Sequence, residues 1–426
     1  MTLTQWKSKS LGYILEKIVG GGTPSKANPQ YWDGDIPWAS VKDLSSTKLD
    51  DTADKISEKG LNNSASNLIP AETIVIPTRM ALGKVAITTQ AMAINQDLKA
   101  LFPSKEVCKS YLFQWLIFHA EQIASLGSGS TVKGIRLEQL KKIPFSYPTL
   151  KEEQQKIAEF LSTVDKKIDL IDQKIAETER LKTGLMQKLF SVGVGVQDEN
   201  GNWQPHTEFK DSKLGKIPDS WNLGTVKDIS PLQGGYAFKS KSATESGVRW
   251  LKIANVGKRR VTWDNDSYLP EKFIEEHSDF LLNEGDIVIA LTRPVLSGEL
   301  KVARLSGKDA PALLNQRVAR INVNCSVADP GFVYYLFEDK RMANSISKVI
   351  LGTDPPNIST KQIESFDIAI PPLEEQKSIR KVLSSVSSKI DLLVQQKVET
   401  QQLKKGLMQK LLTGEWRVPL EETEAA

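Results

Sequence analysis

The stretch that decides the fold occurs twice in the chain. Residues 152–190 read EEQQKIAEFLSTVDKKIDLIDQKIAETERLKTGLMQKLF, and residues 374–412 read EEQKSIRKVLSSVSSKIDLLVQQKVETQQLKKGLMQKLL. Paired at a constant offset of 222 residues, the two stretches share 22 identities in 39 positions. Unrelated segments of this length would share roughly two or three. The chain therefore contains an internal duplication.

The duplication extends toward the N-terminus of each stretch. Residues 129–148 match residues 352–371, from Gly to Pro, at an offset of 223. Three weaker echoes lie farther upstream, and their offsets drift as loop insertions would cause. They are Ile36–Val41 with Val248–Ile253, Ile74–Ile76 with Ile287–Ile289, and Asn95-Gln96 with Asn315-Gln316. The repeating unit is thus a variable region followed by a strongly matched segment.

Apolar residues in the strongly matched stretches recur at alternating spacings of four and three, which is typical of a coiled-coil seam. The first seam comprises Ile157, Leu161, Val164, Ile168, Ile171 and Ile175. The second comprises Ile379, Leu383, Val386, Ile390 and Leu393. Lys397 then stands where Ile175 would recur, and the neighbouring Val394 and Val398 suggest that the seam slips there.

A helix of 39 residues would be about 58 Å long and needs a partner for its apolar face. The simplest partner is the other copy, because antiparallel pairing would bury both seams and give the chain an internal pseudo-two-fold axis. Homodimerisation through each seam separately is the alternative. Gly184 and Gly406 occupy equivalent positions inside these helices, where glycine costs about 1 kcal/mol relative to alanine. A close helix crossing or the docking of another subunit would explain both glycines.

Composition places the chain among folded globular proteins. It has 426 residues, of which 40% are hydrophobic and 25% charged, and this length predicts two to four domains. We find no apolar run long enough for a membrane span and no secretory segment, and therefore expect a cytoplasmic protein without a membrane partner. The isolated Cys108 and Cys325 argue against disulfides and cysteine zinc sites. The net charge of +4 permits nucleic acid as a local contact only.

Short β-like runs, glycine-punctuated loops and helical patterns predict α+β domains upstream of both helical stretches. We expect a globular domain over 1–147, a helical spacer over 148–212, a second globular domain over 213–370 and a second helical spacer over 371–426. The predicted fold class is α+β, with two globular domains joined by two long antiparallel coiled-coil helices.

Loops in both globular domains carry side chains that can donate to phosphates and read base edges. A single basic residue of this kind is a weak indication, because most are merely solvated, and positions that recur in both halves carry more weight. Asn95-Gln96 and Asn315-Gln316 are explained equally well as residues that tie the end of a strand. The candidate DNA-contacting residues are Thr23, Ser25, Lys26, Arg79, Lys84, Asn95, Gln96, Ser130, Thr131, Tyr236, Lys239, Lys258, Arg259, Arg293, Asn315, Gln316 and Arg317.

The sequence lacks the usual motifs of catalysis. Neither GxGxxG before a helix nor GxxxxGK[ST] offers a phosphate cradle. Residues 354–357 read DPPN and lack the aromatic residue with which adenine methyltransferases stack a flipped base, so we interpret them as a turn. His119, His206 and His277 stand apart from one another and outside any HExxH pattern. We expect no catalytic residue, metal or cofactor in this chain.

The order of these segments resembles the specificity subunit of type I restriction-modification systems over essentially the whole chain. The resemblance rests on the two EEQ…KID…GLMQKL blocks, on the Pro-Trp and Asn-Gln echoes, and on residues 214–221, LGKIPDSW, which open the second globular region. The first region departs from that form, because Trp6 follows a polar start without LGxIP. Its N-terminal boundary is therefore less sharply defined.

The resemblance implies a non-catalytic DNA-recognition scaffold. In that family each globular domain reads one half of an asymmetric, bipartite target in double-stranded DNA, and the helices space the two readers. Two methyltransferase subunits bind around the helical core, and restriction subunits, which are ATP-driven translocating endonucleases, join the same assembly. The expected product is N6-methyladenine, with S-adenosylmethionine, ATP and Mg²⁺ bound by partner subunits.

Two other hypotheses stay open on the sequence. One is a self-contained DNA-modifying enzyme with unfamiliar motifs, which methyl transfer or cleavage by this chain alone would favour. The other is a coiled-coil adaptor that binds only proteins. Failure of the chain and its methyltransferase to retain DNA sequence-selectively in moderate salt would favour the adaptor.

Overall fold

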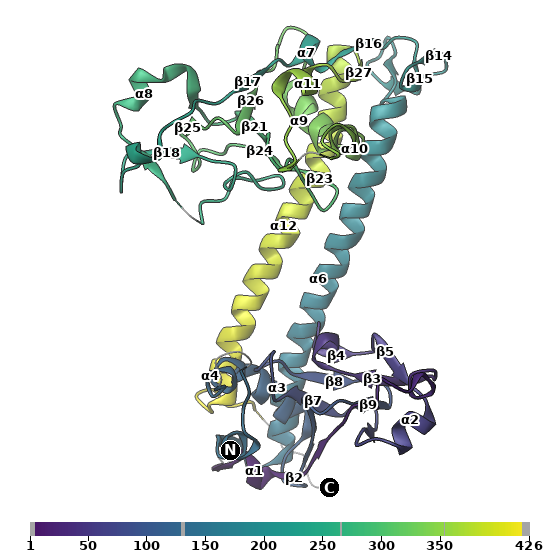
Figure 1. Cartoon of the computed structure of the whole chain (residues 1–426), viewed down its shortest axis with the longest axis vertical. Coiled ribbons are helices and arrows are strands. Elements are labelled where there is room, and N and C mark those ends of the chain that lie inside the picture. Colours follow the sequence, from purple (N-terminus) through teal and green to yellow (C-terminus); the bar gives the residue numbers. More distant parts are fainter. Residues whose placement is uncertain (1–4, 129–132, 265, 353, 420–426) are drawn as a thin grey trace. The chain divides into compact units, whose positions relative to one another are not determined.

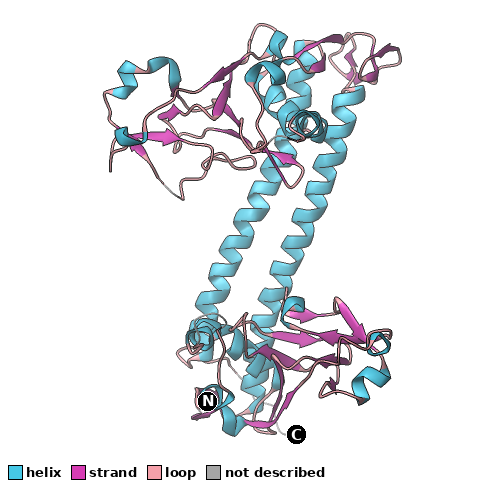
Figure 2. Ribbon diagram, viewed as in Figure 1, coloured by secondary structure: helices cyan, strands magenta, loops and turns pink. Residues whose placement is uncertain are grey.

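The computed structural model describes residues 5–128, 133–264, 266–352 and 354–419. The chain divides into two compact units, residues 1–173 with 394–426 and residues 174–393. Both long helices, α6 (Lys151–Val192) and α12 (Leu373–Leu412), contribute a segment to each unit. Each unit therefore combines one globular domain with two helix segments (Figures 1 and 2). The predicted α+β class with two repeated domains and long helices is confirmed.

Two β-sheets form the first domain. Their strands are β2 (Leu15–Gly20), β3 (Ile36–Ala39), β4 (Lys48–Leu49), β5 (Asp54–Ile56), β6 (Asn67–Ile69), β7 (Ile74–Pro77), β8 (Ala86–Thr88), β9 (Met92–Ile94) and β10 (Leu98–Pro103). The strand orders are β2-β10-β7-β8-β4 and β5-β3-β9-β6. β3 runs parallel to β9 and β4 parallel to β8, while the other neighbours are antiparallel.

The second domain repeats this topology, except that among its described residues no strand corresponds to β4. Its strands are β17 (Leu232–Gly234), β18 (Val248–Leu251), β19 (Tyr268–Leu269), β20 (Leu281–Leu282), β21 (Ile287–Ala290), β24 (Val302–Arg304), β25 (Ala312–Leu314) and β26 (Val318–Ile321). The orders are β17-β26-β21-β24 and β19-β18-β25-β20, and β18 runs parallel to β25 as β3 does to β9. The weak sequence echoes fall on matching strands, β3 with β18 and β7 with β21, so the duplication covers the globular domains as well.

Short helices and small strand pairs complete both domains. The helices are α1 (Leu11–Ile14), α2 (Glu58–Asn62), α3 (Lys109–Phe118), α4 (Ala120–Ser125), α5 (Leu137–Lys141), α7 (Val226–Ile229), α8 (Phe273–Glu276), α9 (Pro330–Glu338), α10 (Lys340–Val349) and α11 (Thr360–Glu364). The 3₁₀ turns are η1 (Pro29–Tyr31), η2 (Val41–Asp43), η3 (Ser240–Ser242) and η4 (Ser278–Phe280). The strand pairs are β1 (Trp6–Ser10) with β11 (Pro144–Pro148), β12 (Val196–Gln197) with β13 (Trp203–Gln204), β14 (Phe209–Ser212) with β15 (Gly215–Pro218), β16 (Asn222–Thr225) with β27 (Asp367–Ile370), and β22 (Val295–Leu296) with β23 (Glu299–Leu300).

The strand pair β1–β11 is the counterpart of β16–β27. Trp6 lies opposite Pro148, and Asn222 lies opposite Ile370. Pro148 and Pro371 are matched by the 223-residue offset, so Trp6 opens the first domain where Trp221 opens the second. The two domains therefore begin alike, although their starting sequences differ.

Buried glutamines dock the long helices on their globular domains, which explains the EEQ motif. Gln154 accepts a hydrogen bond from the Cys108 N–H at 2.7 Å and donates to the carbonyl of Pro148 at 2.9 Å. Gln376 repeats both contacts, with the Asp329 N–H at 3.0 Å and the Pro371 carbonyl at 2.8 Å. Both glutamines are fully buried. An amide that bonds strand-end and helix-start backbone at once fixes the helix angle on each domain.

The glutamates beside these glutamines join each helix start to the chain that follows the other long helix. Glu375 accepts hydrogen bonds from the Trp221 indole at 2.7 Å and from the Val194 N–H at 2.9 Å, and it bonds the His206 ring at 3.0 Å. Glu153 binds Arg417, with Nε to Oε1 at 2.7 Å. Both carboxylates are buried, so these contacts are charge-assisted bonds in a region that excludes water.

The two helix segments pair antiparallel inside each unit. In the first, Asp165 pairs with Lys404 and Asp172 with Lys397, both at 2.6 Å, so the numbers run in opposite directions. In the second, α12 begins beside the end of α6, where Glu375 meets the Val194 N–H. The predicted intrachain antiparallel pairing is confirmed, and homodimerisation through separate seams is not the arrangement.

The suggested slip of the second seam is wrong. Lys397 keeps the seam position half-buried, and the buried Thr400 follows three residues later. Val394 and Val398 are instead 42% and 47% exposed. The seam tolerates a lysine at this position because Asp172 on the facing helix neutralises it.

Candidate nucleic-acid interface

Each globular domain contains a polar depression where loops leave its strands. The first depression is lined by Thr78, Arg79, Gln96, Asp97, Lys99, Ser128, Gly134, Ile135 and Arg136. The second is lined by Gly234, Leu291, Thr292, Gln316, Arg317, Pro355, Asn357, Ile358, Ser359 and Thr360. Both lie beyond the ends of the matched strands β7 and β21 and include the glutamine of an Asn-Gln echo.

Backbone hydrogen bonds show that the two depressions have the same backbone arrangement, which we call their shared frame. The Ile135 N–H donates to the Thr78 carbonyl at 2.9 Å, and the Ile358 N–H donates to the Leu291 carbonyl at 2.9 Å. Thr78 is therefore equivalent to Leu291.

The same frame fixes the neighbouring positions. The Thr78 N–H donates to the Asp97 carbonyl at 2.7 Å, and the Leu291 N–H donates to the Arg317 carbonyl at 2.9 Å. Asp97 and Arg317 thus correspond, and Arg79 corresponds to Thr292. The Thr-Arg pairs of the two domains are one residue out of register, so Arg79 and Arg293 do not occupy equivalent positions.

The first depression combines both signs of charge with an amide. Arg79 is 65% exposed in its side chain, and its Nε lies 3.8 Å from the Asp97 carboxylate. The Lys99 ammonium donates to the Gln96 carbonyl at 2.7 Å, and burial lowers the pKa of Lys99. The Thr23 hydroxyl bonds the Gln96 side chain at 2.5 Å. Three predicted residues, Thr23, Arg79 and Gln96, are therefore brought together here.

The second depression is less constrained by internal ion pairs. Gln316 and Arg317 are exposed, and in the chain as described the guanidinium groups of Arg293 and Arg317 have no polar partner. The Gln316 N–H donates to the Tyr236 carbonyl at 3.0 Å. Tyr236 is 42% exposed, and its ring packs against His277 with ring centroids 4.3 Å apart. This side of the domain offers a basic group, an amide and an aromatic surface.

The asparagines of the two echoes differ in their surroundings. Asn95 is 6% exposed, and its side-chain oxygen accepts bonds from the Asp97 and Leu98 N–H groups, each at 3.1 Å. It therefore ties the end of β9. The corresponding oxygen of Asn315 is buried and has no partner among the described residues.

Several candidate residues lie away from the depressions. Lys84 donates to the Leu44 carbonyl at 2.7 Å, Lys258 pairs with Glu299 at 3.1 Å, and Arg259 binds Glu179 on α6. Thr23, Tyr236 and Arg293 are exposed and lie outside the depression linings, as do Ser25, Lys26 and Lys239. Ser130 and Thr131 lie outside the described residues. The basic character of a loop alone therefore did not distinguish residues that line a depression from residues that lie elsewhere.

The sequence reasoning missed several polar residues that line the depressions. They are Asp97, Lys99, Ser128, Arg136, Asn357, Ser359 and Thr360. The 223-residue offset carried a signal for some of them, because it pairs Gly134–Arg136 with Asn357–Ser359. Those residues immediately precede α5 and α11 and close the depressions against β7 and β21.

The histidines have contacts within the fold. A ring nitrogen of His119 is hydrogen-bonded to the Trp115 carbonyl at 2.9 Å, and burial lowers the pKa of this histidine. Across the described ranges, no group of three or more His, Cys, Asp or Glu side chains is arranged to hold a metal ion. Within those same ranges, no helix is both long and apolar enough to cross a bilayer.

The sequence matches the family model of the type I restriction modification DNA specificity domain over residues 4–180 and 218–402. The chain belongs to this specificity family. The two matched ranges correspond to the two copies of the duplicated unit, each with its globular domain and most of its helix. The depressions described above thus lie in the domains that carry DNA sequence specificity.

Relatives of the whole chain are also specificity subunits. The MjaVIII specificity subunit of Methanocaldococcus jannaschii is 30% identical over 420 residues, which cover 97% of this chain and 93% of that protein. The EcoR124I/EcoR124II specificity subunit of Escherichia coli is 34% identical over 193 residues, 44% of this chain and 46% of that protein. The crystal structure of the S subunit from M. genitalium superposes with a TM-score of 0.58 at 17% identity, over 96% of this chain and 97% of that one.

Proposed function

We propose that this specificity subunit reads a bipartite target in double-stranded DNA, with one half recognised at each polar depression. The observation that carries the proposal is a shared frame with different side chains. Arg79 stands where Thr292 stands, and Asp97 where Arg317 stands. Because each base pair presents its own pattern of donors and acceptors in the major groove, matched frames with unlike side chains suit two unlike half-sites.

The side chains suggest which contacts each depression makes. Arg79 and Arg317 can donate two hydrogen bonds to guanine, and Gln96 and Gln316 can pair with adenine. Asp97 can accept from the cytosine amino group. A basic side chain such as Lys99 can contact phosphate, which positions the domain without carrying sequence information.

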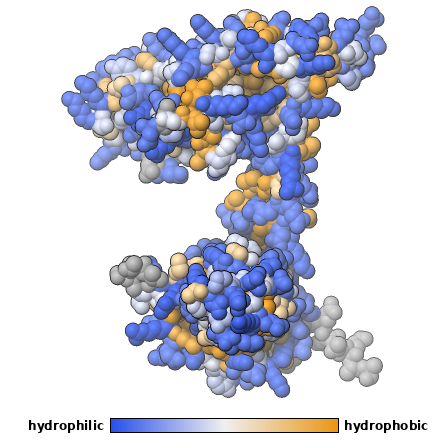
Figure 3. All heavy atoms as spheres, turned by 45° about the vertical axis from the view of Figure 1, so that its right-hand side comes forward, coloured by the Kyte–Doolittle hydropathy of each residue, from blue (hydrophilic) through white to orange (hydrophobic). Residues whose placement is uncertain are grey.

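The helices supply matched surfaces for partner subunits. Leu181 and Leu403 are equivalent and are 54% and 57% exposed. Gly184 and Gly406 follow three residues later, and an added Cβ at either would meet no atom of the described chain within 4 Å apart from adjacent residues and the backbone of its own helix. A close crossing within this chain therefore does not explain the glycines, and this supports docking of a partner at these positions. Hydrophobic side chains interrupt the hydrophilic surface along the helices in the space-filling view (Figure 3).

Two equivalent surfaces suit two copies of one partner, and we assign them to methyltransferase subunits. A solved structure titled as the basis of complex assembly in the type I R-M system shares the fold, with a TM-score of 0.56 at 14% identity over 98% of this chain. In such an assembly S-adenosylmethionine would bind the methyltransferase, and ATP and Mg²⁺ the restriction subunits. This chain would contribute recognition without catalysis, and the complex would act in the cytoplasm.

Methylation mapping tests the proposal. The chain is co-expressed with its methyltransferase in a host without other adenine methylation, and N6-methyladenine is mapped across the genome. We expect one bipartite motif with a gap of unspecified bases, and exchange of residues 1–147 for another reader should change only one half of it. Changes in both halves would contradict independent readers. Methyl transfer by this chain alone would instead support the enzyme hypothesis.

A further inference from the structure

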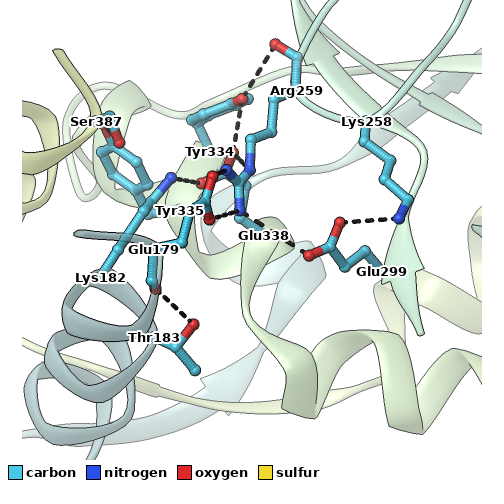
Figure 4. A network of polar contacts seen from close by, with 10 residues as sticks. All are labelled: Glu179, Lys182, Thr183, Lys258, Arg259, Glu299, Tyr334, Tyr335, Glu338 and Ser387. Atoms are coloured by element: carbon cyan, nitrogen blue, oxygen red, sulfur yellow. Dashed lines mark hydrogen bonds and ion pairs between the residues drawn. The ribbon is translucent and has the colours of Figure 1, made fainter. Parts of the chain in front are cut away.

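A cluster of ion pairs joins the second globular domain to α6 through Arg259 (Figure 4). The Arg259 guanidinium donates to both oxygens of Glu179, at 2.8 and 3.2 Å. Its Nε lies 3.4 Å from the Glu338 carboxylate on α9. A planar fork facing a carboxylate fixes both distance and orientation, which a single-point lysine contact does not.

The groups behind Arg259 are held in turn. Glu338 accepts from the Lys182 ammonium at 2.7 Å and from the Tyr334 hydroxyl at 2.9 Å. The side chains of Lys182 and Glu338 are only 3% and 5% exposed. Burial alone would lower the pKa of Arg259, but the facing carboxylates, Glu179 and Glu338 foremost, raise it, so the guanidinium stays charged. Loss of one member would leave other charges in the cluster without a counter-ion.

The backbone of this loop is also constrained. Arg259 has a φ angle of 64°, in the left-handed region that a residue with a Cβ rarely adopts. Its N–H donates to the Val302 carbonyl at 2.8 Å, which ties the loop to β24 of the reading domain. Such a conformation persists where the surroundings over-determine it. The loop is thus fixed to the sheet on one side and to α6 on the other.

We propose that Arg259 is a positioning residue that locks the second domain on the helical spacer, and that it thereby sets the gap between the two half-sites. The proposal rests on the half-site reading put forward above. It reassigns Arg259 from DNA contact to scaffold, because its donors already face Glu179 and Glu338. The lock acts through α6, so loosening it changes where the domain is held and leaves the reading depression intact.

The first domain makes a weaker ion pair with α6 than the second does. Lys48 lies on β4, and its ammonium is 3.6 Å from Asp169. These side chains are 61% and 57% exposed, and exposed pairs of this kind contribute little. Lys48 therefore provides a control for loss of a surface pair, and the exposed neighbour Arg260 provides a control for loss of a loop charge.

The test compares Arg259→Met, Glu179→Gln and their double variant in the full chain, assembled with its methyltransferase. We expect both single variants to lower the melting temperature of the chain by about 2–4 °C. The double variant should be no worse than the more affected single variant, since both changes remove the same bond. Arg260→Met and Lys48→Met should behave as the unmodified chain does. Arg259→Lys keeps the charge and should therefore retain part of the stabilisation. It replaces the methionine variant in the test if that variant does not fold.

The decisive measurement is methylation of synthetic targets whose gap is one base pair longer or shorter. The preference for the correct gap should fall by about tenfold in Arg259→Met and Glu179→Gln, with the bases of both half-sites unchanged. The salt dependence of binding should also be unchanged. The contrary result is that Arg259→Met relaxes base discrimination in the second half-site, or lowers the slope of log affinity against log salt concentration by about one, while Glu179→Gln does neither. In that case Arg259 contacts DNA and the proposal fails. An unmodified chain without any bipartite motif would refute half-site reading itself, whereas the melting and coupling results would still report on the lock.

Discussion

Replacing Gly184 by alanine should stabilise the isolated chain and weaken its complex with the methyltransferase. Gly184 lies inside α6 with open space around an added Cβ. Alanine is favoured over glycine inside a helix by about 0.5–1 kcal/mol, because glycine loses more backbone entropy on folding. With no clash to oppose this gain, the melting temperature should rise by about 1–4 °C. Gly406→Ala should act alike at the equivalent position of α12.

The sign of the effect should reverse on binding. If a partner helix or loop seats against the bare glycine surface, the added methyl group overpacks that contact, which typically costs about 1–3 kcal/mol. This corresponds to a methyltransferase affinity lower by about 5- to 150-fold. Because the two glycines are equivalent, each single variant should impair one of two binding events, and the double variant should impair both.

Calorimetric titration of the chain with methyltransferase, together with thermal unfolding of the free chain, measures both effects. Ser385→Ala is the control, since Ser385 is exposed on α12 and its replacement also raises helix propensity. This control should stabilise the chain slightly and leave binding unchanged. Unchanged affinity in both glycine variants, with the same rise in melting temperature, would refute docking at these positions.

Four further outcomes are expected. Glu375→Ala should lower the free energy of unfolding by about 3 kcal/mol or more in urea titrations, because buried donors including the Trp221 indole lose their acceptor. The control Glu374→Ala should change the free energy of unfolding little. Equal effects of the two variants would contradict a buried anchor at Glu375. Arg79→Ala should relax base discrimination in one half-site and Arg317→Ala in the other, each by about 1–3 kcal/mol. Methylation rates on targets with single-base changes measure this discrimination. If both variants lost discrimination in the same half-site, one reader per domain would be wrong. Seven residues inserted after Gln173 and seven after Gln395 should lengthen both helices by about 10 Å and widen the methylated gap by about three base pairs, and an unchanged gap would exclude a spacer role. Burial alone would raise the pKa of Asp309, but hydrogen bonds from Ser306 and Trp263 outweigh burial and lower this pKa. The stability that the Asp309 carboxylate contributes is present above its unfolded-state pKa and is lost as the pH falls through the lower folded-state pKa. Asp309→Asn should therefore destabilise the chain at pH 7 and flatten the acid limb of a pH–stability curve.

The long helices and the duplication could be predicted because their signals are local and repeated. Spacings of four and three hold through Ile157, Leu161 and Val164, and a second copy with the same pattern supplied the partner. The slip suggested at Lys397 was wrong for a physical reason. Apolarity was used to follow the seam, whereas an aspartate on the facing helix lets a lysine occupy it.

The candidate nucleic-acid interface was predicted only in part, because residues that line it come from segments whose pairing the sequence does not state. Gln96 and Gln316 were found through their echo. Arg136 was missed, because its closure against β7 depends on a backbone bond between Ile135 and Thr78. Composition likewise could not distinguish the basic Arg259 from a DNA-facing arginine, because its partner Glu179 lies 80 residues earlier in the chain.

Comparison of the two copies separates scaffold from reader without any other sequence. Gln154 and Gln376 are the same residue, are both fully buried, and make the same strand-end contacts. Asp97 and Arg317 occupy one backbone position and carry opposite charges. The shared fold by itself gives no physical reason to reverse the charge of this loop position while keeping its backbone bonds. A demand to recognise two unlike surfaces supplies that reason, and it predicts that an Asp97→Arg exchange would shift the first domain toward the base preference of the second without unfolding it.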